Sequence, residues 1–209
     1  MTHIIKSRSK IIRRLGILPG LTQKITNEQS KTPGQHGKST NANKLYSLIS
    51  EDFKIRLNEK QKLKFNYNIR DKQLFAYYKK AKKAKESTSN LLLNNLEMRF
   101  DSIVYRLGFT LTIPEARQLI THGHILLNNK IKTIPSIICK KNDIISISDN
   151  ILIRKKIILN LNKINNNSIC PSYLFIDKIA LIGKILNKLN RSELLLDVKD
   201  LKVIEYYSK

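Results

Sequence analysis

Apolar residues in the centre of the chain recur at three- and four-residue spacing, which predicts a series of helices. The charge pattern of residues 51–69 is typical of a helix with solvated faces. A second helix is predicted over 72–85, with Asp71 as its N-cap. Its narrow apolar stripe consists of Leu74, Phe75, Tyr78, Ala81 and Ala84. A third helix is predicted over 91–107, ended by Gly108.

A short helix and two strand patterns follow. Thr112 and Glu115 have the spacing of a capping box, which predicts a helix over 114–121. Ile125 to Ile131 then indicates a hairpin with Asn128-Asn129 in a primed turn, because Asn tolerates positive φ. Residues 142–149 give a turn and an alternating strand. We therefore expect 97–150 to form a small α/β module in which two helices pack on a short, curled antiparallel sheet.

The two ends of the chain have weaker patterns. Residues 1–50 lack periodicity and contain the turn signals Pro19-Gly20 and 33-PGQHG-37, which indicates an extended basic arm. Residues 151–209 predict an irregular segment, with a last strand over 201–209. The fold class expected is α+β. A mostly helical N-terminal domain (51–96, completed by 151–209) would carry the arm and stand beside the module.

The charge of the chain restricts its partners. Lys and Arg number 39 against 16 acidic residues, a net charge of +23, and residues 1–90 alone hold 21 basic and 6 acidic side chains. Such an excess repels itself unless a polyanion neutralises it. No run approaches the ~20 apolar residues of a spanning helix, so we expect no membrane partner. No zinc-finger or basic-zipper pattern is present, and a loop-rich arm beside a small α/β module favours RNA over duplex DNA.

Catalytic and metal-binding motifs are lacking. The sequence has no GxSxG, no Gly-rich phosphate loop and no paired-carboxylate cluster, so we expect no enzyme, no cofactor and no small-molecule ligand. A metal site built from His122, His124 and Cys139 would lack a fourth ligand, so no metal is expected. Cys139 and Cys170 are interpreted as buried or inert thiols.

Two groups of residues are candidates for binding RNA. The first is the lysine-rich stretch 72–85, which has no acid between Asp71 and Glu86. The second surrounds the short helix of the module, its tight link to the hairpin and the preceding helix. The alternative is that Arg99 pairs with Asp101 or Glu97, that Arg117 pairs with Glu115, and that the histidines are merely solvated. The candidate set is Arg13, Arg14, Lys60, Lys62, Lys64, Lys79, Lys80, Lys82, Lys83, Lys85, Arg99, Arg106, Arg117, Gln118, His122, His124 and Lys130.

The stretch 98-MRFDSIVYRLGFTLTIPEARQLITHGHILLNNKIKTIPSIICKKNDIISI-147 closely resembles the RNA-binding module named after the fourth protein of the small ribosomal subunit. That module also occurs in pseudouridine synthases, tyrosyl-tRNA synthetases and heat-shock RNA-binding proteins. The flanks resemble the ribosomal protein family itself, and 13-RRLGILPGLTQK-24 resembles its plastid form in particular. Those flanks are 33-PGQHG-37, 56-RLNEKQKLKFNYNI-69, 71-DKQLFAYYKKAKKAK-85 and 203-VIEYYSK-209.

The resemblance implies a structural protein that binds small-subunit rRNA directly and early, at a junction of several helices, and nucleates the subunit body. It implies contact with the fifth small-subunit protein and an influence on translational accuracy. It also implies a plastid ribosome and an organelle gene, with the mitochondrion as the alternative location. The family lines the mRNA entrance with basic residues after PGQHG, where this chain has Lys38 and Lys44. The zinc site of some members is absent, because no Cys precedes Cys139. An RNA-modifying or RNA-quality-control protein with the same module is the alternative function, and 151–209 is too short for its catalytic domain.

Overall fold

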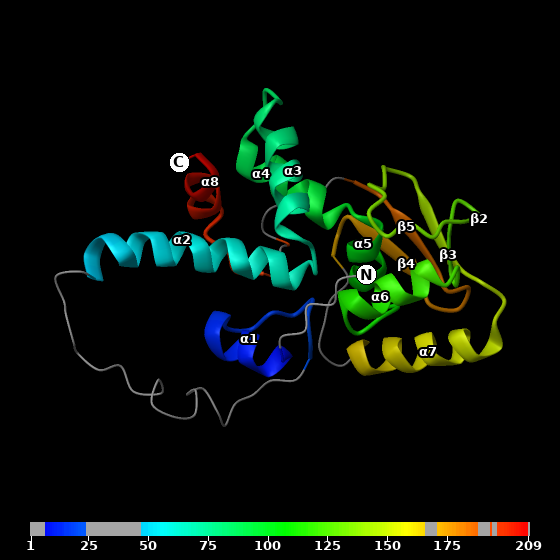
Figure 1. The fold of residues 1–209 in the computed structure, drawn as a ribbon. Helices are drawn as coiled ribbons and strands as arrows, with labels where there is room; N and C mark the ends of the chain where they lie inside the picture. Colours follow the sequence, from blue (N-terminus) through cyan, green and yellow to red (C-terminus); the bar gives the residue numbers. More distant parts are fainter. Residues whose placement is uncertain (1–6, 24–46, 166–170, 188–192, 194–195, 209) are drawn as a thin grey trace.

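The computed structural model describes residues 7–23, 47–165, 171–187, 193 and 196–208. The fold is α+β, as the sequence predicted, with an all-helical part on one side and, on the other, a part in which further helices lie beside a small sheet (Figure 1). Lys38, Lys44, Cys170 and the PGQHG segment lie outside the described residues.

The helical part is built around α2 (Ser47–Asn66), a 20-residue helix that α8 (Asp200–Ser208) crosses. Beside them, α3 (Asp71–Lys82) and α4 (Thr88–Glu97) pair and project away from the rest of the molecule (Figure 1). Apolar residues from these four helices share one core, which includes Leu63, Leu74, Leu96 and Val203. The helices predicted over 51–69 and 72–85 are confirmed. Asp71, however, is the first residue of α3 rather than its N-cap, which is Arg70.

The N-terminal region contains a helix where an extended arm was predicted. Helix α1 (Arg8–Leu15) buries Ile11 and Leu15 against the helical core. Three apolar positions in eight residues are too few to show a period, so the sequence pattern missed this helix. After α1, the Gly20 amide donates to Asn66 Oδ1 at 2.9 Å, and a Cβ at Gly20 would lie 2.7 Å from the Asn66 carbonyl oxygen. Residues 8–21 are therefore packed onto the helical part.

The single helix predicted over 91–107 is interrupted, and this prediction was wrong. α4 ends at Glu97, and α5 (Phe100–Arg106) starts after a break at Met98 and Arg99. At the break the Phe100 amide donates to the Ile137 carbonyl at 2.8 Å, and Arg99 forms an isolated β-bridge with Ile138. These tertiary hydrogen bonds replace the helical ones, so a locally continuous apolar stripe folds as two helices.

The module contains α5, α6 (Ile113–Thr121), β1 (Ile125–Leu127), β2 (Lys130–Ile131) and β3 (Ile144–Ile147). The predicted short helix, hairpin and strand are confirmed. Asn128 and Asn129 have φ of 51° and 59°, as a type I′ turn requires. The Glu115 amide donates to Thr112 Oγ1 at 3.4 Å, which caps α6.

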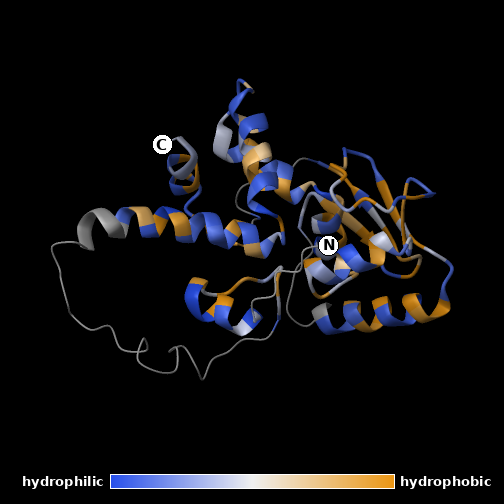
Figure 2. Cartoon of the chain, in the orientation of Figure 1, coloured by the Kyte–Doolittle hydropathy of each residue, from blue (hydrophilic) through white to orange (hydrophobic). Residues whose placement is uncertain are grey.

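The C-terminal region joins both parts. Helix α7 (Ile151–Asn165) packs against the module, and β4 (Leu174–Asp177) and β5 (Ile182–Ile185) extend its sheet. Among the described residues, five strands form one antiparallel sheet in the order β2-β1-β3-β5-β4. Figure 2 shows apolar residues in these strands and, alternating with polar ones, along α7. Gly183 of β5 fits against Leu107, the residue that follows α5, where an added Cβ would lie 2.4 Å from Leu107 Cδ1.

Two predictions for this region were wrong. The described residues 151–165 form a helix rather than an irregular segment, and 200–208 form α8 rather than a strand. Val203, Tyr206 and Tyr207 follow the i, i+3, i+4 spacing of a helix face. The ring centroid of Tyr206 lies 5.9 Å from that of Phe53 on α2. This packing of the 200–208 segment against α2 favours a helix over a strand. No helix of the described ranges is long and apolar enough to span a membrane.

Candidate nucleic-acid interface

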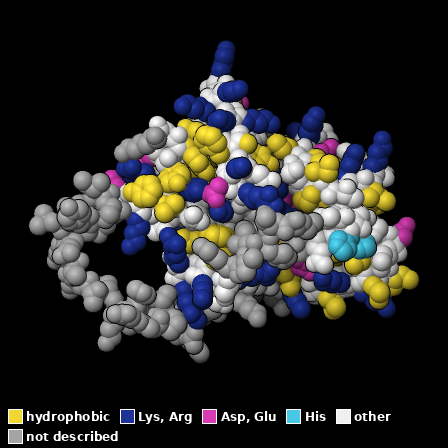
Figure 3. Space-filling model, viewed as in Figure 1, with side chains coloured by type: hydrophobic (Ala, Val, Ile, Leu, Met, Phe, Trp, Pro, Cys, Tyr) yellow, Lys and Arg dark blue, Asp and Glu magenta, His cyan; other side chains and the backbone are white. Residues whose placement is uncertain are grey.

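The projecting end of α3 and α4 carries a dense group of positive side chains. Figure 3 shows Lys and Arg gathered there. Residues Lys79, Lys80, Lys82, Lys83 and Lys85 of the candidate set are exposed, as is Lys72, which the set omitted. None of the six forms an ion pair with another residue of the described segments. The buried face of α3 holds Leu74, Tyr78 and Ala81, so the lysines occupy the outward faces without neutralising partners.

The lysines predicted on α2 are engaged within the protein. Lys60 is 7% exposed, its ammonium pairs with Asp71, and it lies 5.0 Å from the centroid of the Tyr206 ring. Lys64 also pairs with Asp71, and Lys62 pairs with Glu59 at 2.8 Å. The prediction that Lys60 contacts RNA is therefore corrected, because its charge is buried and already neutralised. Lys62 and Lys64 are partly exposed, and their RNA contacts remain predictions.

Arg99 was predicted to face RNA, and the structure buries it at 1% exposure. Its guanidinium donates Nε to Asp101 Oδ1 at 3.0 Å and Nη2 to Asp101 Oδ2 at 2.7 Å. The third donor, Nη1, reaches the Tyr77 hydroxyl on α3 at 2.7 Å. Each of the three guanidinium nitrogens of Arg99 thus has a hydrogen-bond partner inside the protein. The pairing with Asp101, which the sequence left open as an alternative, is the one observed.

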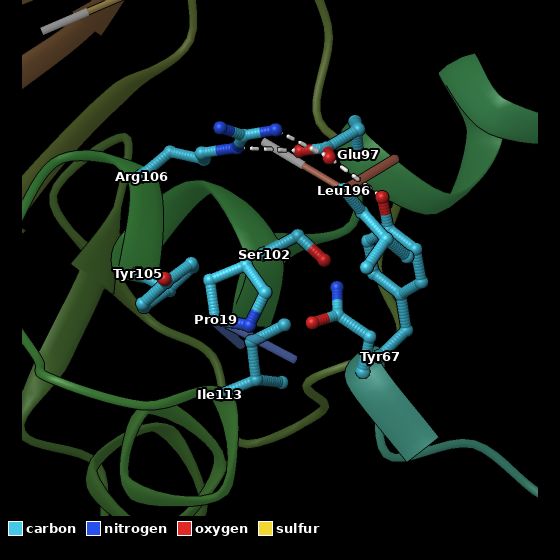
Figure 4. Close-up of a pocket in the computed structure, with 9 residues that line it drawn as sticks. Pro19, Tyr67, Glu97, Ser102, Tyr105, Arg106, Ile113 and Leu196 are labelled. Atoms are coloured by element: carbon cyan, nitrogen blue, oxygen red, sulfur yellow. Dashed lines mark hydrogen bonds and ion pairs between the residues drawn. The ribbon is translucent and has the colours of Figure 1, made fainter. Parts of the chain in front are cut away.

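Arg106 is a second correction. It is 8% exposed and donates Nε to Glu97 Oε2 at 2.8 Å and Nη2 to Glu97 Oε1 at 2.6 Å. Tyr67 donates its hydroxyl to the same carboxylate at 2.6 Å (Figure 4). Burial and the adjacent Glu97 raise the pKa of Tyr67 well above its ordinary value, so the hydroxyl stays a donor. The pocket around this network is also lined by Pro19, Asn66, Ser102, Tyr105, Ile113 and Leu196, so it joins the helical part to the module.

Arg117 lies at the same junction but remains partly accessible. Its Nε donates to Asp101 Oδ2 at 2.8 Å, its Nη1 donates to the Asn68 carbonyl, and its side chain is 25% exposed. The alternative pairing with Glu115 is not observed, because Glu115 pairs with Lys156 at 2.7 Å. Asp101 therefore holds two arginines, one buried and one reaching the surface, between α3, α5 and α6. Arg117 is positioned with a fixed guanidinium at the edge of the module.

The remaining candidates of the module lie on its surface. Gln118 and His122 are exposed, His124 is half-buried, and the two histidine rings lie 6.0 Å apart (cyan in Figure 3). Gly123 between them has φ of 74° and would place a Cβ 3.2 Å from Ile131 Cγ2 of β2, so the link fits tightly against the hairpin. Exposed Lys130 belongs to that strand. On α1, Arg14 is exposed and Arg13 half-buried.

The described residues contain neither a metal-binding cluster nor a reactive thiol. No group of three or more His, Cys, Asp and Glu residues there is placed to hold a metal ion. Cys139 is buried, and burial together with nearby Asp143 raises the pKa of its thiol to about 12, so it stays a neutral thiol in the core.

Comparison with known proteins agrees with this arrangement. Residues 4–97 match the model of the ribosomal protein S4/S9 N-terminal domain, and residues 98–145 match that of the S4 domain. The boundary between the two matches falls at the break between α4 and α5.

Relatives extend over nearly the whole chain. The small ribosomal subunit protein uS4c of Rhodomonas salina is 46% identical over 200 residues, which cover 96% of this chain and 95% of the relative. The protein of the same name from Prototheca wickerhamii is 47% identical over 202 residues (97% and 96%). The small ribosomal subunit protein uS4 of Thermosynechococcus vestitus is 43% identical over 202 residues (97% and 96%). With both domain models matched in order and relatives aligned end to end, the chain belongs to the ribosomal protein S4 family, in its plastid and bacterial form.

Proposed function

We propose that this protein is a structural component of the small ribosomal subunit of plastids and binds small-subunit rRNA directly. The observation that carries the proposal is the group of six exposed lysines on α3 and the following turn, which form no ion pair within the described residues, in a chain of net charge +23. Family members are named as small-subunit ribosomal proteins rather than enzymes, and several carry the chloroplast name uS4c. These names favour the plastid over the mitochondrion and do not support the RNA-modifying alternative.

The two parts of the protein contribute differently to binding. The α3–α4 end supplies charge without fixed geometry, because its lysines are exposed and flexible. The module supplies fixed donors, since Arg117 is held by Asp101 and by the Asn68 carbonyl while Gln118 and His122 face solvent. Charge-driven contacts set affinity and its salt dependence, whereas fixed donors select an RNA shape. We therefore infer that the module chooses the rRNA site and that the α3–α4 end strengthens binding.

The finer roles follow from family membership. We propose early binding at a junction of rRNA helices, nucleation of the subunit body, and an influence on translational accuracy through the neighbouring fifth small-subunit protein. Phe53, 55% exposed, and Tyr206, whose ring centroid lies 5.9 Å from that of Phe53, give an apolar spot where α2 meets α8, of the kind that a neighbouring protein covers. An mRNA contact through Lys38 and Lys44, and a plastid gene for the protein, remain proposals.

Filter binding of the full chain to small-subunit rRNA, against a scrambled RNA of equal length, tests the proposal. The double variant Lys82→Gln/Lys83→Gln should weaken binding and reduce the slope of log K against log[salt] by about 1.4–1.8, as expected for two lost phosphate contacts. The control is Lys155→Gln/Lys163→Gln on α7, two lysines that are equally exposed and unpaired within the described residues. Equal losses for the two pairs, or equal affinity for the scrambled RNA, would contradict a defined rRNA site.

A further inference from the structure

An exposed aromatic ring lies within the row of unpaired lysines on α3. Lys72, Phe75, Lys79 and Lys82 follow one another at i, i+3, i+7 and i+10, so they share one face of the helix. Phe75 is 39% exposed, although it is a large apolar side chain. The Lys79 ammonium lies 4.6 Å from the centroid of its ring. Positive charge therefore surrounds an accessible ring.

The ring of Phe75 is fixed from within the protein. It lies 5.5 Å from the ring of Tyr207 on α8 and 6.3 Å from that of Tyr78, with which it is stacked. Tyr78 is buried and stacks on Tyr207 at 5.0 Å. Two aromatic side chains from different helices thus hold the ring in one orientation. A ring that is rigid on one side and accessible on the other is suited to stacking with a flat ligand.

We propose that Phe75 is a stacking platform for an unpaired base of the bound rRNA, with Lys72, Lys79 and Lys82 on the phosphates beside it. This inference rests on the proposed rRNA binding and names the part of the RNA that α3 recognises. Lysines interleaved with an aromatic ring are the combination that binds single-stranded nucleic acid, in which bases stack and phosphates meet positive charge. A duplex would not offer a free base face, so the ligand is an unpaired nucleotide.

The contact between Lys79 and Phe75 does not oppose this. A lysine over an exposed ring gains little, equivalent to a factor of about two to five in an equilibrium constant. Stacking of one base on an aromatic side chain contributes about 5- to 100-fold. The flexible Lys79 side chain can move from the ring to a phosphate while a base takes its place, so the same residue serves the free and the bound protein.

Phe53 provides a matched control. It is more exposed than Phe75, at 55%, and it also contacts a tyrosine of α8. No lysine lies over its ring in the described structure, and its two sequence neighbours, Asp52 and Lys54, carry opposite charges. Exposure alone would make Phe53 the better stacking site, whereas the charge around the ring favours Phe75.

The chain contains no Trp, so a single substitution creates a fluorescent reporter. We expect Phe75→Trp to keep rRNA affinity and to show strong fluorescence quenching on binding, because a stacked base quenches indole. Phe53→Trp should not be quenched. Phe75→Leu, which retains apolar volume without a stacking face, should weaken binding about 5- to 100-fold with an unchanged salt slope. Lys79→Gln should instead flatten the slope.

Two results separate the inference from the function it rests on. Wild-type affinity of Phe75→Leu, together with unquenched Phe75→Trp, would overturn the stacking platform while leaving rRNA binding intact. Failure of the unsubstituted chain to prefer small-subunit rRNA over scrambled RNA would instead overturn the proposed function. If Phe75→Leu lowers the melting temperature, the quenching of Phe75→Trp decides, because that variant keeps an aromatic ring against Tyr207.

Discussion

Asp101 is the residue whose loss should damage the fold most, because it neutralises buried charge. Its carboxylate is fully buried and accepts hydrogen bonds from Arg99, Arg117 and the Ser102 amide. Asp101→Asn keeps the shape but removes the charge and turns one acceptor into a donor. That donor would face a guanidinium N–H, and the Arg99 charge, 1% exposed, would remain buried without a counterion.

Breaking a buried ion pair from one side costs about 3–5 kcal/mol in the free energy of unfolding. With a denaturant slope of about 2 kcal/mol/M, the urea midpoint of Asp101→Asn should fall by about 1.5–2.5 M. Urea unfolding of the full chain, followed by circular dichroism, measures this shift. The matched control is Asp149→Asn, the same chemical change at a fully exposed carboxylate that pairs with Arg154 at 2.6 Å. We expect no measurable change there.

A second variant tests the cause. Arg99→Met in the Asp101→Asn background removes the stranded charge and replaces it with an apolar side chain of similar length, so part of the lost stability should return. A loss below about 1 kcal/mol for Asp101→Asn, or no recovery in the double variant, would refute the argument that an unpaired buried charge is the source of the damage.

Two further predictions concern other contacts. Gly183→Ala should lower the free energy of unfolding, measured by chemical denaturation, by about 1–3 kcal/mol, because its Cβ would lie 2.4 Å from Leu107 Cδ1. Leu107→Val in the same chain should recover part of that loss. A Gly183→Ala variant as stable as the unsubstituted chain would contradict the close packing of β5 on Leu107. Partial burial acts to raise the pKa of Asp71, but hydrogen bonds from Lys60 and Lys64 outweigh it and lower that pKa from 3.8. The ion pairs therefore stabilise the protein above pH 3.8, and this stabilisation is lost as the pH falls through the lower pKa of the folded state. The melting temperature of Asp71→Asn should therefore lie below that of the unsubstituted chain at pH 7 and approach it in acid, and a gap that persists in acid would contradict the assignment.

The sequence predicted elements whose signals are local. The primed turn at Asn128-Asn129, the cap at Thr112 and the buried face of α3 each depend on neighbouring residues, and each is present. Of the stripe predicted for α3, however, Phe75 and Ala84 are exposed. Elements decided by distant contacts were missed. The end of α4 depends on a hydrogen bond from Phe100 to Ile137, and the helical state of 200–208 depends on packing against α2.

The same distinction between local and distant contacts applies to the candidate RNA-binding residues. Exposed lysines of 79–85 could be recognised because no acid lies between Asp71 and Glu86. Arg99 and Arg106 were placed in the same candidate set, and the fold shows that Asp101 and Glu97 neutralise them inside the protein. An arginine close in sequence to an acid, at a position flanked by apolar residues, is the signal that could have separated the two groups. Lys60 gave no such signal, because its partner Asp71 lies beyond the end of α2.

The packing of α8 across α2 also sets an order of folding during synthesis. Arg56 of α2 donates to Glu205 of α8 at 3.1 Å, a contact between residues 149 positions apart in the chain. The module and its sheet lie between them and use nearby residues, so they can form as soon as β5 has been translated. The helical part is the first to be synthesised and the last to close its core, because Val203 arrives among the final residues described. A nascent chain therefore leaves the core around Leu63 and Phe65 of α2 without Val203 for most of its translation, and a stop codon shortly before residue 200 would leave that core incomplete while the module remained folded.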